Sequence, residues 1–323
     1  PGCRLQSLRS FRPTLARSRR LLAQTSRPGF RFGNPKRYVQ CSKTKTRKFG
    51  GQMTDRESPI PTMTLGLVSI PVKENDFQHN LEAVAEVIAQ YSSEAIDLFV
   101  FGEANLTGLN TTHFKSRTFL DTTSALQAIN RVTGEYHASI CVGFIEHEAE
   151  KFYLTHVLSS DGTTCGMQRK VLAANPTKPS VYTSGKQINP IIFRGYKVVI
   201  LACADWLTPE PMMQAGIHEP DLILAPTDQF HWEPHSRSVH TKAGQGISFW
   251  LQAPLAVAFN SEINPEPAEL EVCACLGYDH KGDEVIRKSK KQVERTIYTM
   301  TVELKKRRLI WGGFEARRNY VEN

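Results

Sequence analysis

The chain has 323 residues, of which 40% are apolar and 22% charged, as in an ordinary globular protein with a large core. It contains no run near the ~18 apolar residues that a membrane-spanning helix needs, so we expect no membrane partner. The net charge of +8 arises from residues 1–52, which hold 14 of the 40 Lys and Arg and no acidic residue, leaving 26 basic against 32 acidic residues elsewhere. This mildly acidic body lacks the electrostatic attraction that nucleic acids require, and we expect no nucleic-acid partner.

Residues 1–62 form a basic extension that we expect to lie outside the folded domain. The composition of residues 1–52, rich in Arg and Ser and free of acidic residues, resembles a mitochondrial or plastid transit peptide. Two other interpretations together outweigh that one: a disordered tail, or upstream sequence that is not normally translated, with Met53 or Met63 as the natural start. We expect one domain over residues 63–305 and a C-terminal tail over residues 306–323.

The cysteines favour a reducing compartment. There are seven of them, without zinc-ligand spacing or a C-x-x-C pair, at Cys3, Cys41, Cys141, Cys165, Cys203, Cys273 and Cys275. Such a set indicates free thiols rather than a disulfide framework, so we expect a cytoplasmic protein. A mitochondrial or plastid location follows only if the extension is a genuine transit peptide.

The body begins with a strand–helix–strand unit. Residues 65–70 are an apolar run, and residues 76–91 carry apolar side chains at the spacing of one helical face. Residues 95–101 form a second apolar run. This order predicts a βαβ unit with parallel strands and a right-handed crossover.

Glu103 directly follows the second predicted strand. One interpretation places it on a solvated loop, or at the start of a helix, where it would favour the helix dipole. The other makes it a general base at the carboxyl end of the sheet, where ligands of α/β proteins bind. Position alone leaves both open.

The next elements lead to a lysine. They are a helix at 122–132, a strand at 138–145 and a hairpin of strands 152–158 and 165–170. The Asp161–Gly162 dipeptide between the hairpin strands is a strong turn signal. The hairpin ends on Lys170, which on position alone is an exposed lysine at a strand end.

The rest of the body repeats this rhythm of strand, helix, strand and hairpin. Its predicted elements are a hairpin of strands 191–193 and 198–201, helices at 211–215 and 235–252, strands at 221–226 and 255–260, a strand–turn–strand at 271–286 and a last strand at 296–302. The apolar run 198–201 leads to Cys203, at the end of a strand buried on both faces. A small buried hydrophobe is the commoner role of a free cysteine, and position alone leaves that role ahead.

Taken together, these three positions resemble the Glu-Lys-Cys triad of the carbon–nitrogen hydrolase (nitrilase) superfamily. Glu103 after the second strand, Lys170 after the hairpin and Cys203 in a Cys-Ala-Asp-x-x-x-Pro-Glu segment match the triad in order and approximate spacing. The resemblance covers about residues 64–305. It implies an α/β fold, a four-layer α-β-β-α sandwich of two pseudo-symmetric halves.

The resemblance also implies a chemistry. Cys203 would be the nucleophile that forms a thioester with the acyl group of a small linear amide or carbamoyl compound. Glu103 would accept the thiol proton and pass it to the leaving ammonia or amine, while Lys170 and the backbone N–H of Ala204 would stabilise the oxyanion. No metal or organic cofactor is implied. The implied partners are an amide or nitrile substrate and further copies of the chain, in a homodimer or larger homo-oligomer.

One departure from the family pattern lies between the lysine and the cysteine. The family usually carries a second glutamate there, and its place falls near Lys178, within residues 171–185, which contain no Asp or Glu. A second cation beside Lys170 would lower the pKa of that lysine by like-charge repulsion. A degenerate member that binds without turnover therefore stays open as an alternative. A nitrilase acting on a nitrile is a further one.

Two weaker signals concern other positions. His231, His235 and His240 lie close together, but without a nearby cysteine they favour a solvated loop over a metal site. Residues 227–232 follow a strand near the cysteine, and we expect them to form a wall of the site.

Overall fold

The computed structural model describes residues 61–109, 121–173, 181–228, 234–262 and 271–304. The elements of its first half are β1 (Thr62–Ser69), α1 (Phe77–Gln90), β3 (Leu98–Val100), α2 (Thr122–Glu135), β4 (Ser139–Glu148), β5 (Lys151–Ser160) and β6 (Thr163–Arg169). The predicted order of elements is confirmed. Helix α1 starts after Asp76, whose side chain accepts a hydrogen bond from the His79 N–H. Strand β3 is shorter than predicted, since the Asp97 carboxylate takes the Thr64 N–H where strand pairing would begin.

The second half also follows the predicted order. Its elements are β7 (Ile191–Phe193), β8 (Tyr196–Ile200), α3 (Pro209–Ile217), β9 (Leu222–Thr227), α4 (Pro234–Leu251), β10 (Leu255–Phe259), β12 (Glu271–Tyr278), β13 (Glu284–Lys291) and β14 (Thr296–Glu303). The sequence does not predict the 3₁₀-helix η2 (Cys203–Leu207), nor the short parallel pair β2 (Pro71–Val72) and β11 (Ser261–Glu262). No helix in the described ranges is long and apolar enough to cross a bilayer.

The strands form two six-stranded mixed sheets of the same topology. In the first sheet β1, β3 and β4 are parallel, and β5 and then β6 continue the sheet with antiparallel pairing. In the second sheet β8, β9 and β10 are parallel, and β12 and then β13 continue it in the same way. The edge strands β14 and β7 pair antiparallel with β1 and β8. The two halves are thus topological repeats, as the family resemblance implies.

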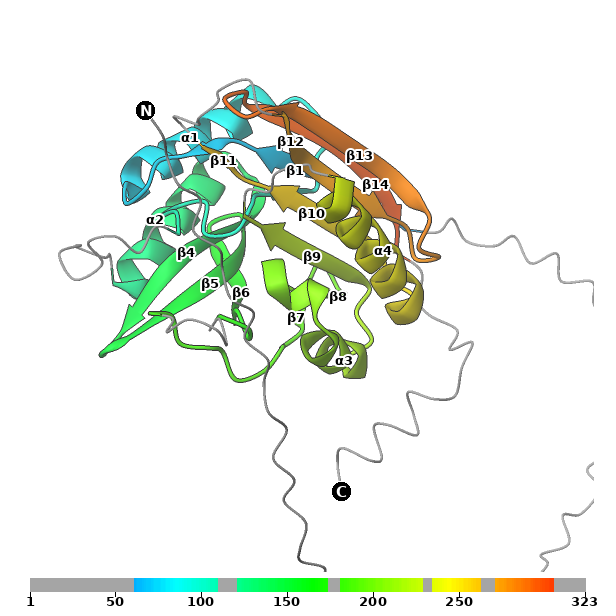
Figure 1. The fold of residues 1–323 in the computed structure, drawn as a ribbon. Helices are drawn as coiled ribbons and strands as arrows, with labels where there is room; N and C mark the ends of the chain where they lie inside the picture. The colour runs from blue at the N-terminus through cyan, green and yellow to red at the C-terminus, as the bar shows by residue number, and fades with distance from the viewer. Residues whose placement is uncertain (1–60, 110–120, 174–180, 229–233, 263–270, 305–323) are drawn as a thin grey trace, which may run out of the picture. The chain divides into compact units, whose positions relative to one another are not determined.

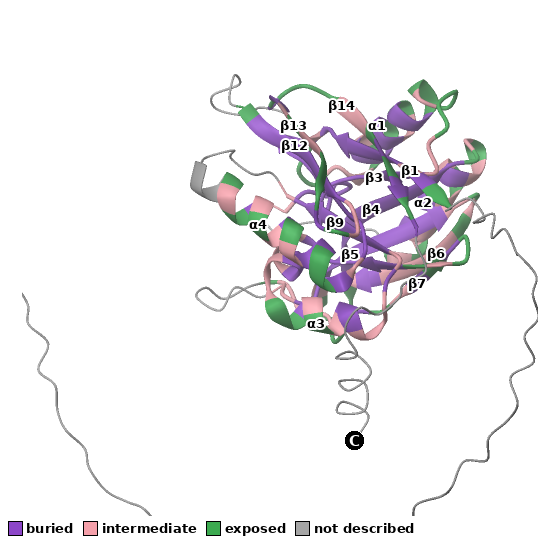
Figure 2. Cartoon of the chain, turned by 90° about the vertical axis from the view of Figure 1, so that its right-hand side faces the viewer, coloured by how far each residue is buried: buried purple, intermediate pink, exposed green. Residues whose placement is uncertain are grey.

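The two sheets pack face to face, with helices on both outer faces (Figure 1). An apolar cluster that includes Leu65 of β1 and Leu224 of β9 fills the space between the sheets. Helices α1 and α2 cover the first sheet through a cluster around Val84 and Ile129, and α4 covers the second through a cluster that includes Ile247. The architecture is the expected four-layer α-β-β-α sandwich. Figure 2 shows the central strands buried along most of their length, while the outer strands β6, β13 and β14 are mostly intermediate or exposed.

Candidate active site

Glu103 lies just past the carboxyl end of β3, next to the end of β9. Its backbone N–H donates to the carbonyl of Thr227 at 3.1 Å. Gly102 makes this approach possible, because a Cβ at that position would lie 2.2 Å from Asn260 Oδ1. Glu103 is only 1% exposed, so the interpretation that places it on a solvated loop is wrong.

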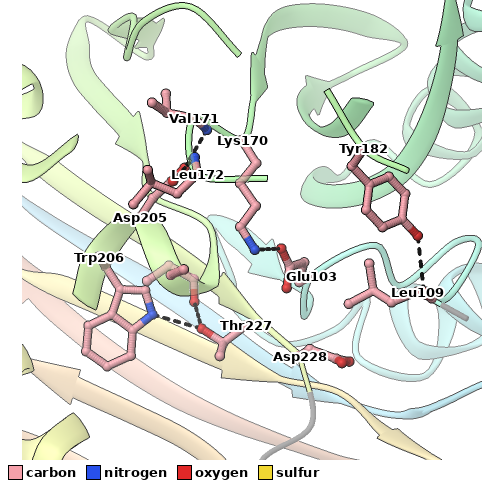
Figure 3. A network of polar contacts seen from close by, with 12 residues as sticks. Glu103, Leu109, Lys170, Val171, Leu172, Tyr182, Asp205, Trp206, Thr227 and Asp228 are labelled. Carbon is pink, nitrogen blue, oxygen red and sulfur yellow. Dashed lines mark hydrogen bonds and ion pairs between the residues drawn. The ribbon is translucent and has the colours of Figure 1, made fainter. Parts of the chain in front are cut away.

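Lys170 follows β6 and points at Glu103. Its Nζ lies 2.6 Å from Glu103 Oε1, and the lysine is 7% exposed, so the expectation of an exposed strand-end lysine is wrong (Figure 3). Burial alone would lower the pKa of Lys170. The charge of Glu103, the charge that Cys203 carries once it is ionised, and the hydrogen bond to Glu103 outweigh that effect and raise the pKa of Lys170. Lys170 is therefore a fixed cation at any physiological pH.

Cys203 follows β8 and begins η2, with a backbone φ of +47°. This left-handed conformation is uncommon for a residue with a Cβ, and such residues cluster at functional sites. The residue is partly exposed, unlike a packed core cysteine. Burial of the sulfur and the charge of Glu103 raise the pKa of the thiol to about 12, against the opposing effects of Lys170 and a hydrogen bond from the Asp228 backbone. The resting group is a thiol, and the structure brings Glu103, Lys170 and Cys203 together.

The turn after Cys203 is held by two hydrogen-bonding residues. The Ala204 carbonyl accepts a hydrogen bond from Thr208 Oγ1 at 2.8 Å, which closes η2 beside the sulfur. Asp205 is fully buried, and its two oxygens accept the backbone N–H groups of Val171 at 3.0 Å and Leu172 at 2.8 Å. Figure 3 shows this carboxylate against the segment that follows Lys170. Asp205 thus ties the turn of the cysteine to the end of the lysine strand.

Asp205 belongs to the Cys-Ala-Asp-x-x-x-Pro-Glu segment of the family resemblance, but the sequence assigns it no role. Burial raises the pKa of its carboxyl to about 6, while the N–H groups of Leu172 and Val171 and the charge of Lys170 act in the opposite direction. Its place two residues after Cys203 is the only local signal. The backbone groups that it binds are 33 and 34 residues away in sequence, so only the fold reveals the contact.

Arg169, the last residue of β6, braces the strand that delivers Lys170. Its Nε and Nη2 donate to the two oxygens of Glu146, both at 2.8 Å, and its guanidinium carbon lies 3.9 Å from the centroid of the Tyr153 ring. Burial would raise the pKa of Glu146, but the hydrogen bonds from Arg169 and Thr155 lower it overall. This bidentate pair fixes the end of β6 and hence the direction of the lysine.

The structure describes only Thr227 and Asp228 of the segment 227–232, which we expected to form a wall of the site. Thr227 accepts a hydrogen bond from the Trp206 indole N–H at 3.0 Å, and the backbone of Asp228 reaches Cys203. Residues 229–232 lie outside the described residues, and so does Lys178. Tyr182 donates its hydroxyl hydrogen bond to the Leu109 carbonyl at 3.1 Å on the Glu103 side of the site (Figure 3).

Of the three neighbouring histidines, the structure describes only the side chain of His240, and this histidine is not on a solvated loop. His240 is buried on α4, with its ring centroid 5.2 Å from that of Trp206. The side chains of His231 and His235 lie outside the described residues. Within the described ranges, no group of three or more His, Cys, Asp or Glu side chains is placed to hold a metal ion.

The comparisons with known proteins agree with this fold. The family model for carbon–nitrogen hydrolases matches residues 64–261. Because the match covers more than half of the chain, the protein belongs to the carbon–nitrogen hydrolase superfamily. It is accordingly a hydrolase acting on carbon–nitrogen bonds. No curated protein matches the chain in sequence.

Solved structures share the fold at low identity. An amidase from Nesterenkonia sp. AN1, with the acetamide moiety of fluoroacetamide on its active-site cysteine, is 17% identical, with TM-score 0.65 over 80% of this chain and 96% of that one. A carbon–nitrogen hydrolase from Helicobacter pylori G27 is 14% identical, with TM-score 0.63 over 81% and 93%. A glutamine-dependent NAD⁺ synthetase from Acinetobacter baumannii is 14% identical, with TM-score 0.64, and the match covers 75% of this chain but 45% of the synthetase.

Proposed function

We propose that this protein is a thiol amidohydrolase that cleaves a small linear amide or carbamoyl compound through a thioester on Cys203. The observation that carries the proposal is the buried Glu103–Lys170 pair at 2.6 Å beside a partly exposed cysteine in a strained turn. An amide carbon needs a strong nucleophile, a proton acceptor and charge stabilisation for its oxygen. These three residues have the chemistry to supply all three.

In the proposed reaction, Cys203 Sγ attacks the amide carbon while Glu103 takes the thiol proton. The carbonyl oxygen becomes an oxyanion, which Lys170 and the backbone N–H of Ala204 stabilise, each such donor contributing ~3 kcal/mol. Glu103 then gives its proton to the leaving nitrogen, the C–N bond breaks and ammonia or an amine departs. A water molecule, deprotonated by Glu103, attacks the thioester and releases the acid and the thiol.

The raised pKa of the Cys203 thiol fits this sequence of steps. A thiol that is protonated at rest needs its base in place at the moment of attack. Glu103 is held for that task by Lys170 on its side chain and by Thr227 on its backbone. Since Lys170 stays protonated, the proton from sulfur goes to Glu103, and the lysine charge remains for the oxyanion.

Ammonia release from a panel of small amides, nitriles and carbamoyl amino acids tests the proposal. Cys203→Ala is expected to lower turnover by ~10⁴-fold or more without loss of folding. Cys165→Ser is the matched control, because Cys165 is a partly exposed cysteine on β6 that the proposed chemistry does not use. Turnover that survives in Cys203→Ala would remove Cys203 from the nucleophile role.

Two alternatives have distinct outcomes in the same panel. A nitrilase would release ammonia from nitriles in preference to amides. A degenerate binding protein, suggested by the lack of Asp and Glu in residues 171–185, would bind amides and form no hydroxamate with hydroxylamine. Hydroxamate formation from an amide supports the amidase and excludes the degenerate member.

The setting of the enzyme is proposed on chemical grounds. A catalytic thiol must stay reduced, and all five described cysteines are free, which fits a reducing compartment such as the cytoplasm. We also propose a homo-oligomer, one catalytic domain over residues 63–305, and segments 1–62 and 306–323 that are not needed for catalysis. Sedimentation tests the oligomer, and the activity of a chain truncated at both ends to residues 61–305, just before β1, tests whether the two flanking segments are dispensable.

A further inference from the structure

Lys290 is a buried cation that the proposed reaction does not use. It lies on β13, an edge strand of the second sheet, and is 4% exposed. Its Nζ donates to Ser261 Oγ at 2.9 Å, to the Ser69 carbonyl at 3.3 Å and to the Glu294 carbonyl. These three bonds take up all three hydrogens of the ammonium. Lys290 therefore acts as a cross-link between three other segments of the chain.

The contacts of Lys290 join the two halves of the molecule. Ser69 ends β1 in the first sheet, and Ser261 begins β11, just after the end of β10 in the second. The Ser261 N–H also donates to the Ile70 carbonyl at 3.1 Å, which ties the same two segments through the backbone. Strands β1 and β10 run parallel to β3 and β9, so their ends lie on the side of the sheets that carries Glu103. The ammonium thus holds Ser261 against the end of β1 on the side of the active site.

Asn260, the residue before Ser261, carries this contact to the proposed base. Its Nδ2 donates to the Glu103 carbonyl at 2.5 Å, and its backbone N–H donates to the Thr227 carbonyl at 3.3 Å. The same Thr227 carbonyl accepts the Glu103 N–H at 3.1 Å. The backbone of Glu103 is thus held on both sides of its Cα by groups that Asn260 supplies or contacts. A displacement of Ser261 would move Asn260 and hence the carboxylate of Glu103.

The packing around Asn260 transmits such a displacement. A Cβ on Gly102 would lie 2.6 Å from Asn260 Cγ and 2.7 Å from its backbone N, so the segment before Glu103 is in tight contact with Asn260. Close-packed groups move together, since no void absorbs the shift. Glu103 Oε1 lies 2.6 Å from Lys170 Nζ, and a misplacement of ~1 Å in a catalytic geometry can cost ~100-fold in rate. Small movements of Ser261 therefore matter for turnover.

We propose that Lys290 is a positioning residue for the amide hydrolysis. Its ammonium holds Ser261, Ser261 fixes Asn260, and Asn260 keeps the backbone of Glu103 where the carboxylate can take the thiol proton. In this arrangement the second half of the repeat supports the base of the first half. The inference rests on the proposed amidase function, and it adds a residue outside the triad through which turnover depends on pH.

Lys290→Met and Ser261→Ala test the proposal through kcat and KM. Lys290→Met removes all three bonds, and kcat is expected to fall about tenfold, with KM within about twofold of the wild type because Lys290 does not touch the substrate. Ser261→Ala removes only the bond to the hydroxyl and is expected to lower kcat about threefold. The double variant is expected to match Lys290→Met, because both changes break the same contact. Additive losses, or a wild-type kcat in Ser261→Ala, would overturn the proposed route.

The pH dependence of kcat separates positioning from a purely structural role. Burial lowers the pKa of Lys290 to about 8, against the opposing charge of Glu294, while Ser69 and Ser261 do not titrate. Above that pH the amine has two hydrogens for three acceptors, and wild-type kcat is expected to fall about threefold between about pH 7 and 9.5. The contribution of Lys290 to stability rises over the same range, so activity and stability move in opposite directions. Lys290→Met is expected to lack the fall in kcat, and a fall of equal size in this variant would refute the proposal.

Hydrogen exchange measures the position of Glu103 without any turnover. The Glu103 N–H is protected by the Thr227 carbonyl, and peptide mass analysis reports its exchange. In Lys290→Met, exchange in the peptide that contains Glu103 is expected to be about tenfold faster, while β5 exchanges as in the wild type. Unchanged exchange at Glu103 would overturn the proposal. Faster exchange with no ammonia from any amide would instead mean that the amidase function fails and the positioning of Glu103 by Lys290 stands.

Lys288→Met is the matched control. Lys288 lies on the same strand, β13, and its side chain is exposed. The same chemical change there is expected to leave kcat, its pH profile and the exchange at Glu103 as in the wild type. Equal effects of Lys288→Met and Lys290→Met would contradict the proposal, because they would come from the loss of a positive charge and not from the hydrogen bonds of Lys290.

Discussion

Two buried lysines lie on corresponding hairpins of the two halves, but their pKa values are shifted in opposite directions. Lys170 follows β6, and Lys290 lies near the end of β13, the outer strand of the equivalent hairpin. They are 7% and 4% exposed. Lys170 pairs with Glu103 at 2.6 Å, whereas Lys290 Nζ donates to Ser261 Oγ at 2.9 Å and to two backbone carbonyls.

The pKa values of the two lysines move in opposite directions. Burial lowers the pKa of any lysine, and for Lys290 this effect dominates, bringing the pKa to about 8 against the opposing charge of Glu294. For Lys170 the effect of burial is outweighed by Glu103 and Cys203, and the pKa is raised. A buried lysine thus keeps its charge where a carboxylate is set against it. Glu103 serves the proposed chemistry twice, as a base and as the reason why Lys170 stays cationic.

Breaking the Glu103–Lys170 pair is expected to have the largest effect. Lys170→Met leaves a buried carboxylate without its partner, which costs about 3–5 kcal/mol of unfolding free energy. Amide hydrolysis is expected to fall below detection, because the oxyanion loses its cation. Urea denaturation and ammonia assays measure both effects.

Two further variants control this prediction. Glu103→Gln with Lys170→Met removes both charges, so most of the stability returns and the activity does not. Lys281→Met changes an exposed lysine in the turn after β12 and is expected to alter stability by less than about 0.5 kcal/mol. If Lys170→Met is as stable as the wild type, the Glu103–Lys170 ion pair is not the cause of the difference in pKa between Lys170 and Lys290.

Gly102→Ala tests the placement of Glu103, with a smaller effect. The new Cβ would meet Asn260 Oδ1 at 2.2 Å and the Asn260 backbone N at 2.7 Å, so the chain must shift, at about 1–3 kcal/mol. Activity is expected to fall with stability, since Glu103 moves relative to Lys170. In Gly246→Ala on α4 the added Cβ has no atom within 4 Å, and this control is expected to be neutral or slightly stabilising. Equal melting temperatures for the two variants would contradict the account.

Lys290→Met tests the other half through pH. The folded-state pKa of about 8 lies below the ordinary 10.5, so between these values the unfolded chain binds more protons. The contribution of Lys290 to stability therefore rises with pH over that window, by roughly 2 kcal/mol between pH 8 and 10. Denaturation at pH 7, 8, 9 and 10 measures the slope. The variant is expected to lose this increment, and a wild type and variant with parallel profiles would refute the lowered pKa.

Asp205→Asn is expected to have the smallest effect on folding. The amide keeps one acceptor for the Val171 or Leu172 N–H and presents an N–H to the other, at a cost of about 1–2 kcal/mol. Because Asp205 positions the segment after Lys170, kcat is expected to fall about tenfold with little change in KM. A fall in stability without a change in kcat would make Asp205 a purely structural residue.

Much of the fold is predictable from the chain because its signals are local. Apolar runs, one helical periodicity and the Asp161–Gly162 turn predict the order of elements in both halves. The same runs predict that Glu103 and Cys203 stand at strand ends, and the family resemblance supplies their association with Lys170. The predicted length of strand β3 is wrong. The Asp97 carboxylate binds the Thr64 N–H, and this contact, rather than the strand propensity of residues 95–101, decides where pairing begins.

The rest of the site depends on contacts that are distant in sequence. Asn260 binds the Glu103 carbonyl across 157 positions, and Asp205 binds backbone groups more than 30 positions away. Asp228 is predicted only as part of the wall 227–232, and it lies near Cys203 because the neighbouring parallel strands β8 and β9 end side by side. The Lys-rich sequence around Lys290 predicts an exposed strand, and only the structure shows that Lys290 is buried. The contacts of such side chains can be identified only in the folded structure.

The most direct test of the central claim is the mass of the enzyme during turnover. The wild type is mixed with the amide of the panel that it cleaves fastest, quenched in acid and digested. The account predicts an increase equal to the acyl group on the peptide that contains Cys203, absent from Cys203→Ala and replaced by a hydroxamate in solution when hydroxylamine is present. Ammonia release with no acyl group on Cys203, or with the acyl group on another residue, would contradict it.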